Sequence, residues 1–314
     1  MTNPKVSIII LNWNGVEDTM ECLESLKKIT YPNYEVIIVD NASSGNDVNI
    51  LREKYGEYIH VIANDKNSGF PEGCNIGMRH ALGKGTDYLL LLNNDTIVDP
   101  AFLTEMVKVA ESDPSIGIIG SKIYYYYFPN RIQSAGGKII WWLGYISIYG
   151  EAEDTGQYDE MAERDYLYGT SLLIKKSVVE NISFMDTYFF FGPEELDYCT
   201  RAKRAGYKVI YLPQSKVWHK VGVSRAKVSQ FPELRDFIRK SAGYRTYKYD
   251  YRLFRTYCVP VLFIFPFFLR IIQNSLLGDS IRLIWRGDWQ RIKSGIVKRL
   301  EFLSKVTNKS HLPH

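Results

Sequence analysis

Short, almost continuous apolar runs alternate with amphipathic segments through the first 120 residues of the chain. The apolar runs predict β-strands at residues 6–11, 35–39, 59–63 and 88–92. Strands that are covered on both faces, as in a parallel sheet, have this composition. Between the first two runs, apolar residues recur every three or four positions from Val16 to Leu26, which predicts a helix. The alternation favours an α/β fold, a mostly parallel sheet with helices on both faces.

The same kind of pattern continues further along the chain. Residues 99–112 predict a helix with Asp99 as its N-cap and Pro100 at its first position. Residues 166–176 and 208–213 predict two more strands. Between these strands, a turn at Gly192 and Pro193 leads into a predicted helix that ends near Gly206.

Polar side chains follow three of the predicted strands. Asn12 and Asn14 follow the first, Asp40 and Asn41 follow the second, and "LLLLNNDT" places Asn93, Asn94 and Asp95 after the fourth. In open α/β sheets, ligands bind outside the carboxyl ends of the strands. The three polar strand ends therefore predict a ligand cleft at one edge of the sheet.

The first strand-to-helix turn argues against a dinucleotide-binding oxidoreductase. Asp40 ends the second strand, where such enzymes place an acid on a ribose hydroxyl. However, the turn reads "NWNGVED" and has one glycine, whereas the dinucleotide fingerprint needs G-x-G-x-x-G for close approach to a pyrophosphate. A nicotinamide enzyme is therefore disfavoured.

Three glycines recur at intervals of four in "NSGFPEGCNIGMRHA". Gly73 and Gly77 would share one face of a helix, and Gly69 with Asn67 suits a tight turn before it. One interpretation is close packing of the helix on the sheet. Together with the polar strand ends, a loop that contacts a nucleotide is the favoured interpretation.

Charge is unevenly distributed along a chain of otherwise ordinary composition. Residues 1–215 hold 19 Lys and Arg against 29 Asp and Glu, whereas residues 216–314 hold 20 against 6, so the net charges are −10 and +14. An acidic body with a basic tail predicts an anionic partner for the tail, either nucleic acid or a lipid surface. The cysteines form no C-x-x-C pair and the N-terminus shows no export signal, so a cytoplasmic setting is expected.

The basic tail contains two apolar features. The uncharged run at residues 256–269 has 14 residues, fewer than the about 20 that a membrane-spanning helix needs. Residues 281–300 carry an apolar stripe with Trp285 and Trp289 at helical spacing among Arg and Lys, which predicts a helix lying on an anionic membrane surface. A helix packed on the rest of the chain is the alternative, and no nucleic-acid-binding motif accompanies the basic residues.

Five motifs over residues 5–225 resemble family 2 glycosyltransferases of the GT-A fold in order and spacing, namely "IIILNWNG", "VIIVDNASS", "NSGFPEGCNIG", "LLLLNNDT" and "FFGPEELDYCTRAKRAGY". They look most like the rhamnosyltransferase branch that builds cell-surface polysaccharides. The resemblance implies a GT-A catalytic domain at residues 1–225. Residues 226–314 would then be a helical, membrane-associating region, peripherally attached to the inner face of the cell membrane.

The resemblance also implies a nucleotide-sugar donor and a divalent metal, Mn²⁺ or Mg²⁺. Asp95 would be a metal ligand, and His219 is a candidate third ligand. The sequence departs from the usual D-x-D motif because Asn93 replaces the first acid. The donor site would include Asn12, Asn14, Asp40, Asn41, Ser43, Asn67, Gly69, Phe70, Gly73, Asn75, Asn93 and Asn94, with Asp40 on the nucleobase.

In this resemblance the acidic segment "EELD" carries the chemistry. Glu195 would be the general base that takes a proton from the acceptor hydroxyl, with Glu194 beside it and Asp197 positioning the acceptor or a loop. Acids in a first helical turn also stabilise the helix dipole, which is the structural alternative. The predicted activity is inverting sugar transfer from dTDP-rhamnose or a UDP-sugar to a lipid-linked saccharide or polysaccharide. A sugar nucleotidyltransferase and a non-catalytic carbohydrate-binding protein are the alternatives.

Overall fold

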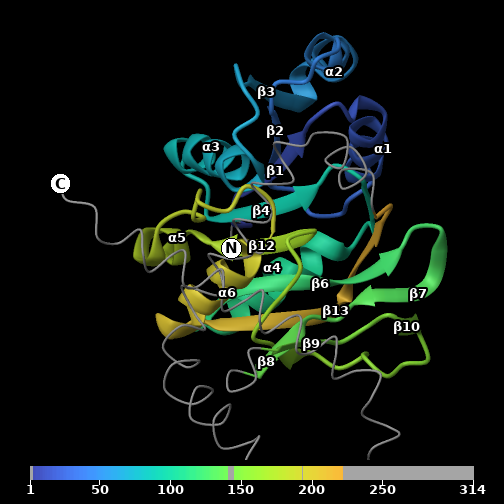
Figure 1. Ribbon diagram of the computed structural model, residues 1–314, viewed down its shortest axis with the longest axis vertical. Helices are drawn as coiled ribbons and strands as arrows, with labels where there is room; N and C mark the ends of the chain where they lie inside the picture. Colours follow the sequence, from blue (N-terminus) through green and yellow to red (C-terminus); the bar gives the residue numbers. More distant parts are fainter. Residues whose placement is uncertain (1–2, 141–144, 193, 222–314) are drawn as a thin grey trace, which may run out of the picture. The chain divides into compact units, whose positions relative to one another are not determined.

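The computed structural model describes residues 3–140, 145–192 and 194–221. Its centre is a large mixed β-sheet with helices on both faces (Figure 1). The strand order along the sheet is β10-β7-β6-β12-β4-β1-β2-β3, and β13 joins it beside β6. This confirms the predicted fold class.

The four predicted N-terminal strands are confirmed. They are β1 (Val6–Asn12), β2 (Tyr34–Asp40), β3 (Ile59–Ala63) and β4 (Tyr88–Asn93). β1 lies between β2 and β4, and β2 pairs with β3, all in parallel. The carboxyl ends of these strands therefore meet at one edge of the sheet, as the polar strand ends required.

The second half of the sheet is mostly antiparallel. β12 (Ser171–Lys175) pairs with β4 and with β6 (Ile116–Tyr125), and a hairpin joins β6 to β7 (Phe128–Ser134). β13 (Lys208–His219) runs parallel to β6 and antiparallel to β5 (Thr96–Val98). The remaining short strands are β8 (Gly137–Ile140), β9 (Tyr145–Ile148), β10 (Ala152–Glu153) and β11 (Ala162–Glu163).

Two helical layers cover the sheet because its central strands are apolar on both faces. Ile8 and Ile10 belong to one core with α1 (Val16–Leu26), α2 (Asp47–Tyr55) and α4 (Phe102–Ser112). Ile9 belongs to the other core with α3 (Phe70–Gly83), α5 (Lys176–Ile182) and α6 (Glu194–Arg204). A short 3₁₀ helix, η1 (Gly56–Tyr58), precedes β3.

Two predicted boundaries are wrong. The helix predicted over 99–112 begins at Phe102, because Asp99 closes a turn by accepting hydrogen bonds from the amides of Ala101 and Phe102. The strand predicted over 166–176 begins at Ser171, and residues 168–170 before it line a cavity instead.

The basic tail lies outside the described residues. The predicted domain boundary at residue 225, the apolar run at 256–269 and the amphipathic helix at 281–300 therefore remain predictions. Within the described ranges, no helix combines the length and the apolarity needed to span a bilayer.

Helix α3 packs on β1 through glycines. A Cβ atom on Gly73 would lie 2.4 Å from Leu11 Cδ1, and one on Gly77 would lie 2.5 Å from Ile9 Cγ2. Such distances are well below carbon van der Waals contact. The interval of four residues therefore reflects helix-on-sheet packing at these two positions.

We expect Gly77→Ala to lower the free energy of unfolding by about 1–3 kcal/mol, the usual effect of overpacking a core. Gly83 is the matched control, since it ends the same helix and a Cβ there would meet nothing within 4 Å. Gly83→Ala should be neutral or stabilise by up to about 1 kcal/mol through helix propensity. Urea denaturation of both variants measures the difference, and equal effects would contradict the packing argument.

Candidate active site

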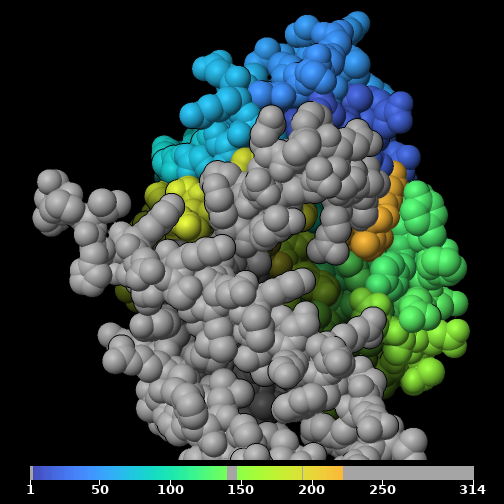
Figure 2. Space-filling view, in the orientation of Figure 1, coloured from blue at the N-terminus to red at the C-terminus, as the bar shows by residue number. Residues whose placement is uncertain are grey.

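A cavity of about 460 Å³ opens at the carboxyl ends of β1, β2 and β4. Many of the predicted site residues share its lining, namely Asn41, Asn67, Gly69, Phe70, Asn93, Asn94, Asp95, Glu194, Glu195 and His219. The end of β13 (orange) lies against the β6–β7 region (green) (Figure 2). The structure therefore brings together residues from both halves of the chain.

A buried polar network lies behind the cavity wall and joins the ends of β1 and β2. Asn12 Nδ2 donates to Asp40 Oδ1 at 2.7 Å and to Asp47 Oδ2 at 2.9 Å. Asp40 Oδ2 also accepts from the amide of Ser43 at 2.9 Å. Asn12 and Asp40 are almost fully buried, and neither they, Ser43 nor Asn14 lines the cavity. In this arrangement they brace the loops that do.

Asn41 organises the loop that leads into α3. Its Nδ2 donates to Asn67 Oδ1 at 2.8 Å and to the carbonyl of Gly69 at 3.2 Å. Gly69 has φ +86°, and a Cβ there would lie 2.7 Å from the carbonyl oxygen of Phe190. The amide of Phe70 donates to that same carbonyl at 2.8 Å. Glycine at this position therefore lets the 186–192 segment close over the start of α3.

Two further predicted donor-site residues, besides Asn12, Asn14, Asp40 and Ser43, lie outside the cavity lining. Gly73 packs against β1, as described above. Asn75 is buried and exchanges two hydrogen bonds with the backbone of Met185, at 2.9 and 3.0 Å. Both residues therefore fix α3 and the 186–192 segment in place.

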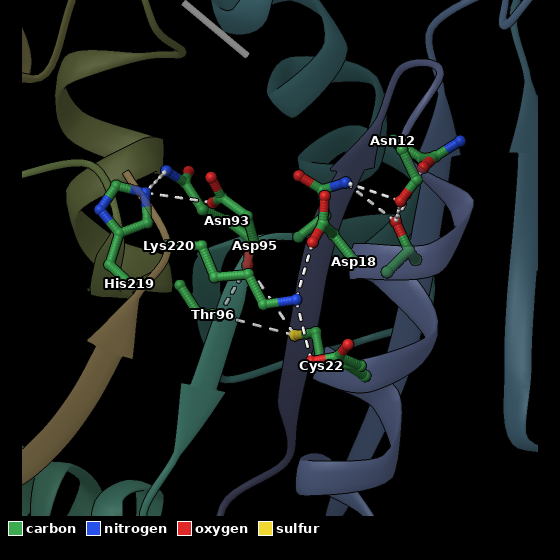
Figure 3. A network of polar contacts seen from close by, with 12 residues as sticks. Asn12, Asp18, Cys22, Asn93, Asp95, Thr96, His219 and Lys220 are labelled. Atoms are coloured by element: carbon green, nitrogen blue, oxygen red, sulfur yellow. Dashed lines mark hydrogen bonds and ion pairs between the residues drawn. The ribbon is translucent and has the colours of Figure 1, made fainter. Parts of the chain in front are cut away.

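Asp95 and His219 meet at the turn between β4 and β5 (Figure 3). Asp95 Oδ1 lies 3.1 Å from His219 Nε2, and Asn93 Nδ2 lies 3.4 Å from the same nitrogen. His219 reaches this place because the last residues of β13 pair with β5, with His219 opposite Thr96. A pair that is 124 residues apart in sequence thus becomes a direct contact.

The hydrogen bonds of His219 leave its Nε2 free to accept. His219 Nδ1 donates to Gln133 Oε1 at 2.9 Å, so in the neutral ring the Nε2 lone pair faces the Asp95 carboxylate. Burial raises the pKa of Asp95, but with a protonated ring the hydrogen bond from Nε2 and the charge of His219 outweigh it, so the pKa is lowered and Asp95 stays ionised. With a neutral ring, the Nε2 lone pair and the Asp95 carboxylate are two acceptors that face each other, and a cation between them would stabilise this arrangement.

The pair also fits two ligands of one divalent ion. Adjacent ligands on an octahedral ion with bonds of about 2.1 Å lie about 3.0 Å apart, and the observed separation is 3.1 Å. The bond from His219 Nδ1 to Gln133 is the support that metal-bound histidines commonly have. In the described part of the chain, no third His, Cys, Asp or Glu joins them, so further ligands would be amides, water or substrate oxygens.

Lys220, which the sequence analysis did not select, ties this corner to α1. Its Nζ lies 2.8 Å from both Asp18 Oδ1 and Glu21 Oε2, and its amide donates to the carbonyl of Asp95 at 2.9 Å (Figure 3). Lys220 is 8% exposed. Because it follows His219 directly, these contacts fix where the histidine ring lies.

The acidic segment of α6 forms another wall of the cavity. Glu195 Oε1 accepts a hydrogen bond from the Tyr166 hydroxyl at 3.0 Å. Glu194 is buried, and burial followed by the charge of Glu195 raises its pKa well above the usual range. Asp197 points elsewhere, into an ion pair with Arg201 at 2.7 Å, and does not line the cavity. Glu195 is therefore the carboxylate of this wall that lies beside a neutral Glu194.

Several lining residues were missed by the sequence analysis. They are Leu11, Trp13, Asp18, Tyr125, Gln133, Glu151, Tyr168, Gly169, Thr170, Phe190, Phe191, Gly192 and Val221. The sequence did contain an indication that Asp18 lies near the site, since Asp18 is in the first turn of the helix that follows a polar strand end. Tyr125, Gln133 and Glu151 had no such indication, because the β6–β7 hairpin and the pairing of β10 with β7 bring them to the cavity.

Known proteins resemble this chain over much of its length. The low-salt glycan biosynthesis hexosyltransferase Agl10 of Haloferax volcanii is 26% identical over 208 residues, covering 65% of this chain and 63% of Agl10. The O-antigen biosynthesis protein RfbC of Myxococcus xanthus is 29% identical over 260 residues, covering 77% of this chain and 19% of RfbC. The chain thus spans less than two thirds of the length of these curated relatives.

The sequence places the chain in one enzyme family, and a solved structure shares its fold. The crystal structure of GalNAc-T7 with UDP, GalNAc and Mn²⁺ superposes with a TM-score of 0.58 at 17% identity, covering 69% of this chain and 44% of that one, which shows a shared GT-A-like fold. Residues 7–182, more than half of the chain, match the family described as Glycosyl transferase family 2. The chain belongs to Glycosyl transferase family 2.

Proposed function

We propose that the cavity binds a nucleotide-sugar donor and transfers its sugar, with inversion, to a saccharide acceptor. The observation that carries this proposal is that one cavity is lined both by the Asn93–Asp95–His219 corner and by Glu195. The corner suits a cation with a diphosphate, and the carboxylate suits a proton acceptor. The relative Agl10 is named a hexosyltransferase, and GalNAc-T7 was solved with UDP and a sugar.

The charge of the cavity supports a metal-bound diphosphate. Among its described lining residues are five carboxyl groups, those of Asp18, Asp95, Glu151, Glu194 and Glu195, and no lysine or arginine. Even with Glu194 protonated and Asp18 paired with Lys220, the carboxylates of Asp95, Glu151 and Glu195 would face an anionic diphosphate. Opposite charge has to be supplied, and a divalent cation is the compact source.

Asp95 and His219 would hold that cation, with Asn93 beside them. When bound, Mn²⁺ or Mg²⁺ stabilises the negative charge on the leaving diphosphate. Gln133 and Lys220 keep His219 in place, through its Nδ1 and through the neighbouring backbone. The rigid end of β4 presents Asp95 in a fixed position.

Glu195 would act as the general base. An acceptor hydroxyl attacks the anomeric carbon as its proton passes to Glu195, and the bond from that carbon to the diphosphate oxygen breaks. The hydrogen bond from Tyr166 orients the carboxylate. The raised pKa of Glu194 keeps it protonated, so a second negative charge does not compete beside Glu195.

The donor and acceptor are proposed by chemical class. dTDP-rhamnose or a UDP-sugar is the proposed donor. A lipid-linked saccharide or growing polysaccharide is the proposed acceptor, in line with the glycan and O-antigen biosynthesis named for two relatives. An enzyme acting on a lipid-linked acceptor would work at the membrane surface, which is the proposed role of the basic tail.

Asp95→Ala should abolish metal-dependent donor binding and leave the protein folded, because a strand-end acid contributes little to the core. Calorimetric titration with UDP or dTDP, with and without Mn²⁺, measures this. Asp65→Ala is the matched control, since Asp65 is exposed beyond β3 and should bind as the wild type does. Unchanged metal-dependent binding in Asp95→Ala would remove Asp95 from the site.

Glu195→Gln keeps the shape of the side chain and removes its basicity, so we expect kcat to fall by about 10²-fold or more. The dissociation constant of the donor should change little. Glu180→Gln on the exposed face of α5 serves as the control. Normal turnover in Glu195→Gln would place the base elsewhere, with Glu194 or Asp197 as the next candidates.

For the tail, we expect the full-length protein to sediment with liposomes that contain anionic lipids, because basic side chains near the surface contribute about 1 kcal/mol each. Raised salt should weaken this binding by screening. Replacing Trp285 and Trp289 by Ser should weaken it even at low salt, because less apolar surface is buried. Protein that stays in the supernatant at every lipid composition would contradict membrane association.

A further inference from the structure

One wall of the cavity has no part in donor, metal or base chemistry. Tyr125 at the end of β6, Glu151 just before β10 and Tyr168 just before β12 line it. Glu151 is exposed and Tyr125 is half-buried, so both are open to a ligand. An accessible carboxylate beside two aromatic rings is unusual for a purely structural wall.

The backbone around Glu151 is built to hold this carboxylate in place. Glu151 has φ +58°, a left-handed conformation that costs free energy in a residue with a side chain. A Cβ on the preceding Gly150 would lie 2.6 Å from the carbonyl oxygen of Gln133, so the loop lies directly on β7. Arg131 Nη2 donates to the carbonyl of Glu151 at 2.9 Å. Strain held by surrounding contacts points to a functional position.

The tyrosine hydroxyl completes a polar edge. Tyr125 Oη lies 2.9 Å from each carboxylate oxygen of Glu151, and burial, followed by the hydrogen bond to Glu151, raises the pKa of Tyr125 to about 12. The hydroxyl therefore stays protonated. Glu151 keeps lone pairs to accept further hydrogen bonds, and charge-assisted bonds of this kind are strong.

The aromatic ring of Tyr168 links this edge to the catalytic base. Its centroid lies 5.4 Å from that of Tyr166, with the rings nearly perpendicular at 87°, and Tyr166 donates to Glu195. An apolar ring face next to hydrogen-bonding groups matches a sugar, which has an apolar C–H face and a rim of hydroxyls.

We propose that Tyr125, Glu151 and Tyr168 form the subsite for the sugar ring of the acceptor, with Glu151 accepting hydrogen bonds from its hydroxyls and the tyrosine rings packing on its C–H face. This inference rests on the proposed sugar-transfer function and adds the residues that select the acceptor. Tyr125 also lies opposite His219 in the β6–β13 register, and Gln133 bonds to His219. The subsite thus shares its supporting strands with the metal corner.

The test measures the binding of methyl glycosides, since the acceptor is proposed only by its chemical class, a saccharide. Saturation-transfer NMR would use the full chain with UDP or dTDP and Mn²⁺, and methyl glycosides of glucose, galactose, mannose and rhamnose. The variants are Glu151→Gln, Tyr125→Phe and Tyr168→Ala. The matched controls are Glu153→Gln, two residues further along in β10, and Tyr127→Phe, which is 68% exposed at the hairpin tip.

We expect the wild type and both controls to bind at least one glycoside, and Glu151→Gln and Tyr168→Ala to weaken that binding by about tenfold or more, as losing a charge-assisted bond or a ring contact would. Tyr125→Phe should weaken it less. With any glycoside that accepts sugar, the change should fall on the acceptor KM and not on kcat.

Nucleotide binding on the same samples separates two kinds of failure. Wild-type protein that binds neither UDP nor dTDP with Mn²⁺ would contradict the proposed function itself, and the subsite with it. Nucleotide binding without any glycoside binding, or equal glycoside binding in Glu151→Gln, Tyr168→Ala and the controls, would contradict the subsite alone.

Discussion

The parallel register of β1 with its two neighbours is the constraint on which the site depends. It places Asn12 opposite Asp40 across β1 and β2, and Leu11 opposite Asn93 across β1 and β4. The change from apolar to polar residues therefore falls within one residue of the same position on β1, β2 and β4, and the polar side chains at the strand ends lie close together. A shift of one residue would bury the polar ends and move each strand side chain to the opposite face of the sheet. The two apolar cores thus hold the polar edge in register.

The second constraint is the change of partner along β13. The strand first follows β6 in parallel, has a register irregularity between Leu212 and Lys216, and then also pairs with β5. This path brings His219 between Thr96 and Tyr125. His219 consequently contacts both Asp95 and the end of β6, and the ion pairs of Lys220 with α1 secure that junction. Geometry at the cavity is therefore set by long-range strand pairing and not by a single loop.

The sequence was most informative where a pattern reflects local packing. The N-terminal strands, α1 and the polar strand ends follow from periodicity, since each depends on residues close in sequence. The role of Gly73 and Gly77 was harder to predict, because the same spacing of glycines occurs in a nucleotide-contacting loop and in a helix packed closely on a sheet. Only the short distances to Leu11 and Ile9 in the structure distinguish these two roles. Asn12 and Asp40 were recognised as important, but their mutual bonds turn them away from the cavity. Tyr125 and Glu151 could not be found, because only the pairing of β7 with both β6 and β10 brings them together.

The distribution of charge and aromatic rings suggests a division of labour between the two halves of the chain. The N-terminal strands end in small amides and acids, which suit a hydrated, cation-bound diphosphate. The segments from β6 to β12 contribute tyrosines and the carboxylate of Glu151, whose backbone is fixed by its neighbours. Such groups suit an uncharged sugar ring with hydroxyls. Glu195 belongs to neither group, since it lies on α6 and accepts a hydrogen bond from Tyr166. As the proposed base, Glu195 would lie between the proposed acceptor and donor walls, where a proton has to leave one substrate as the bond to the other forms.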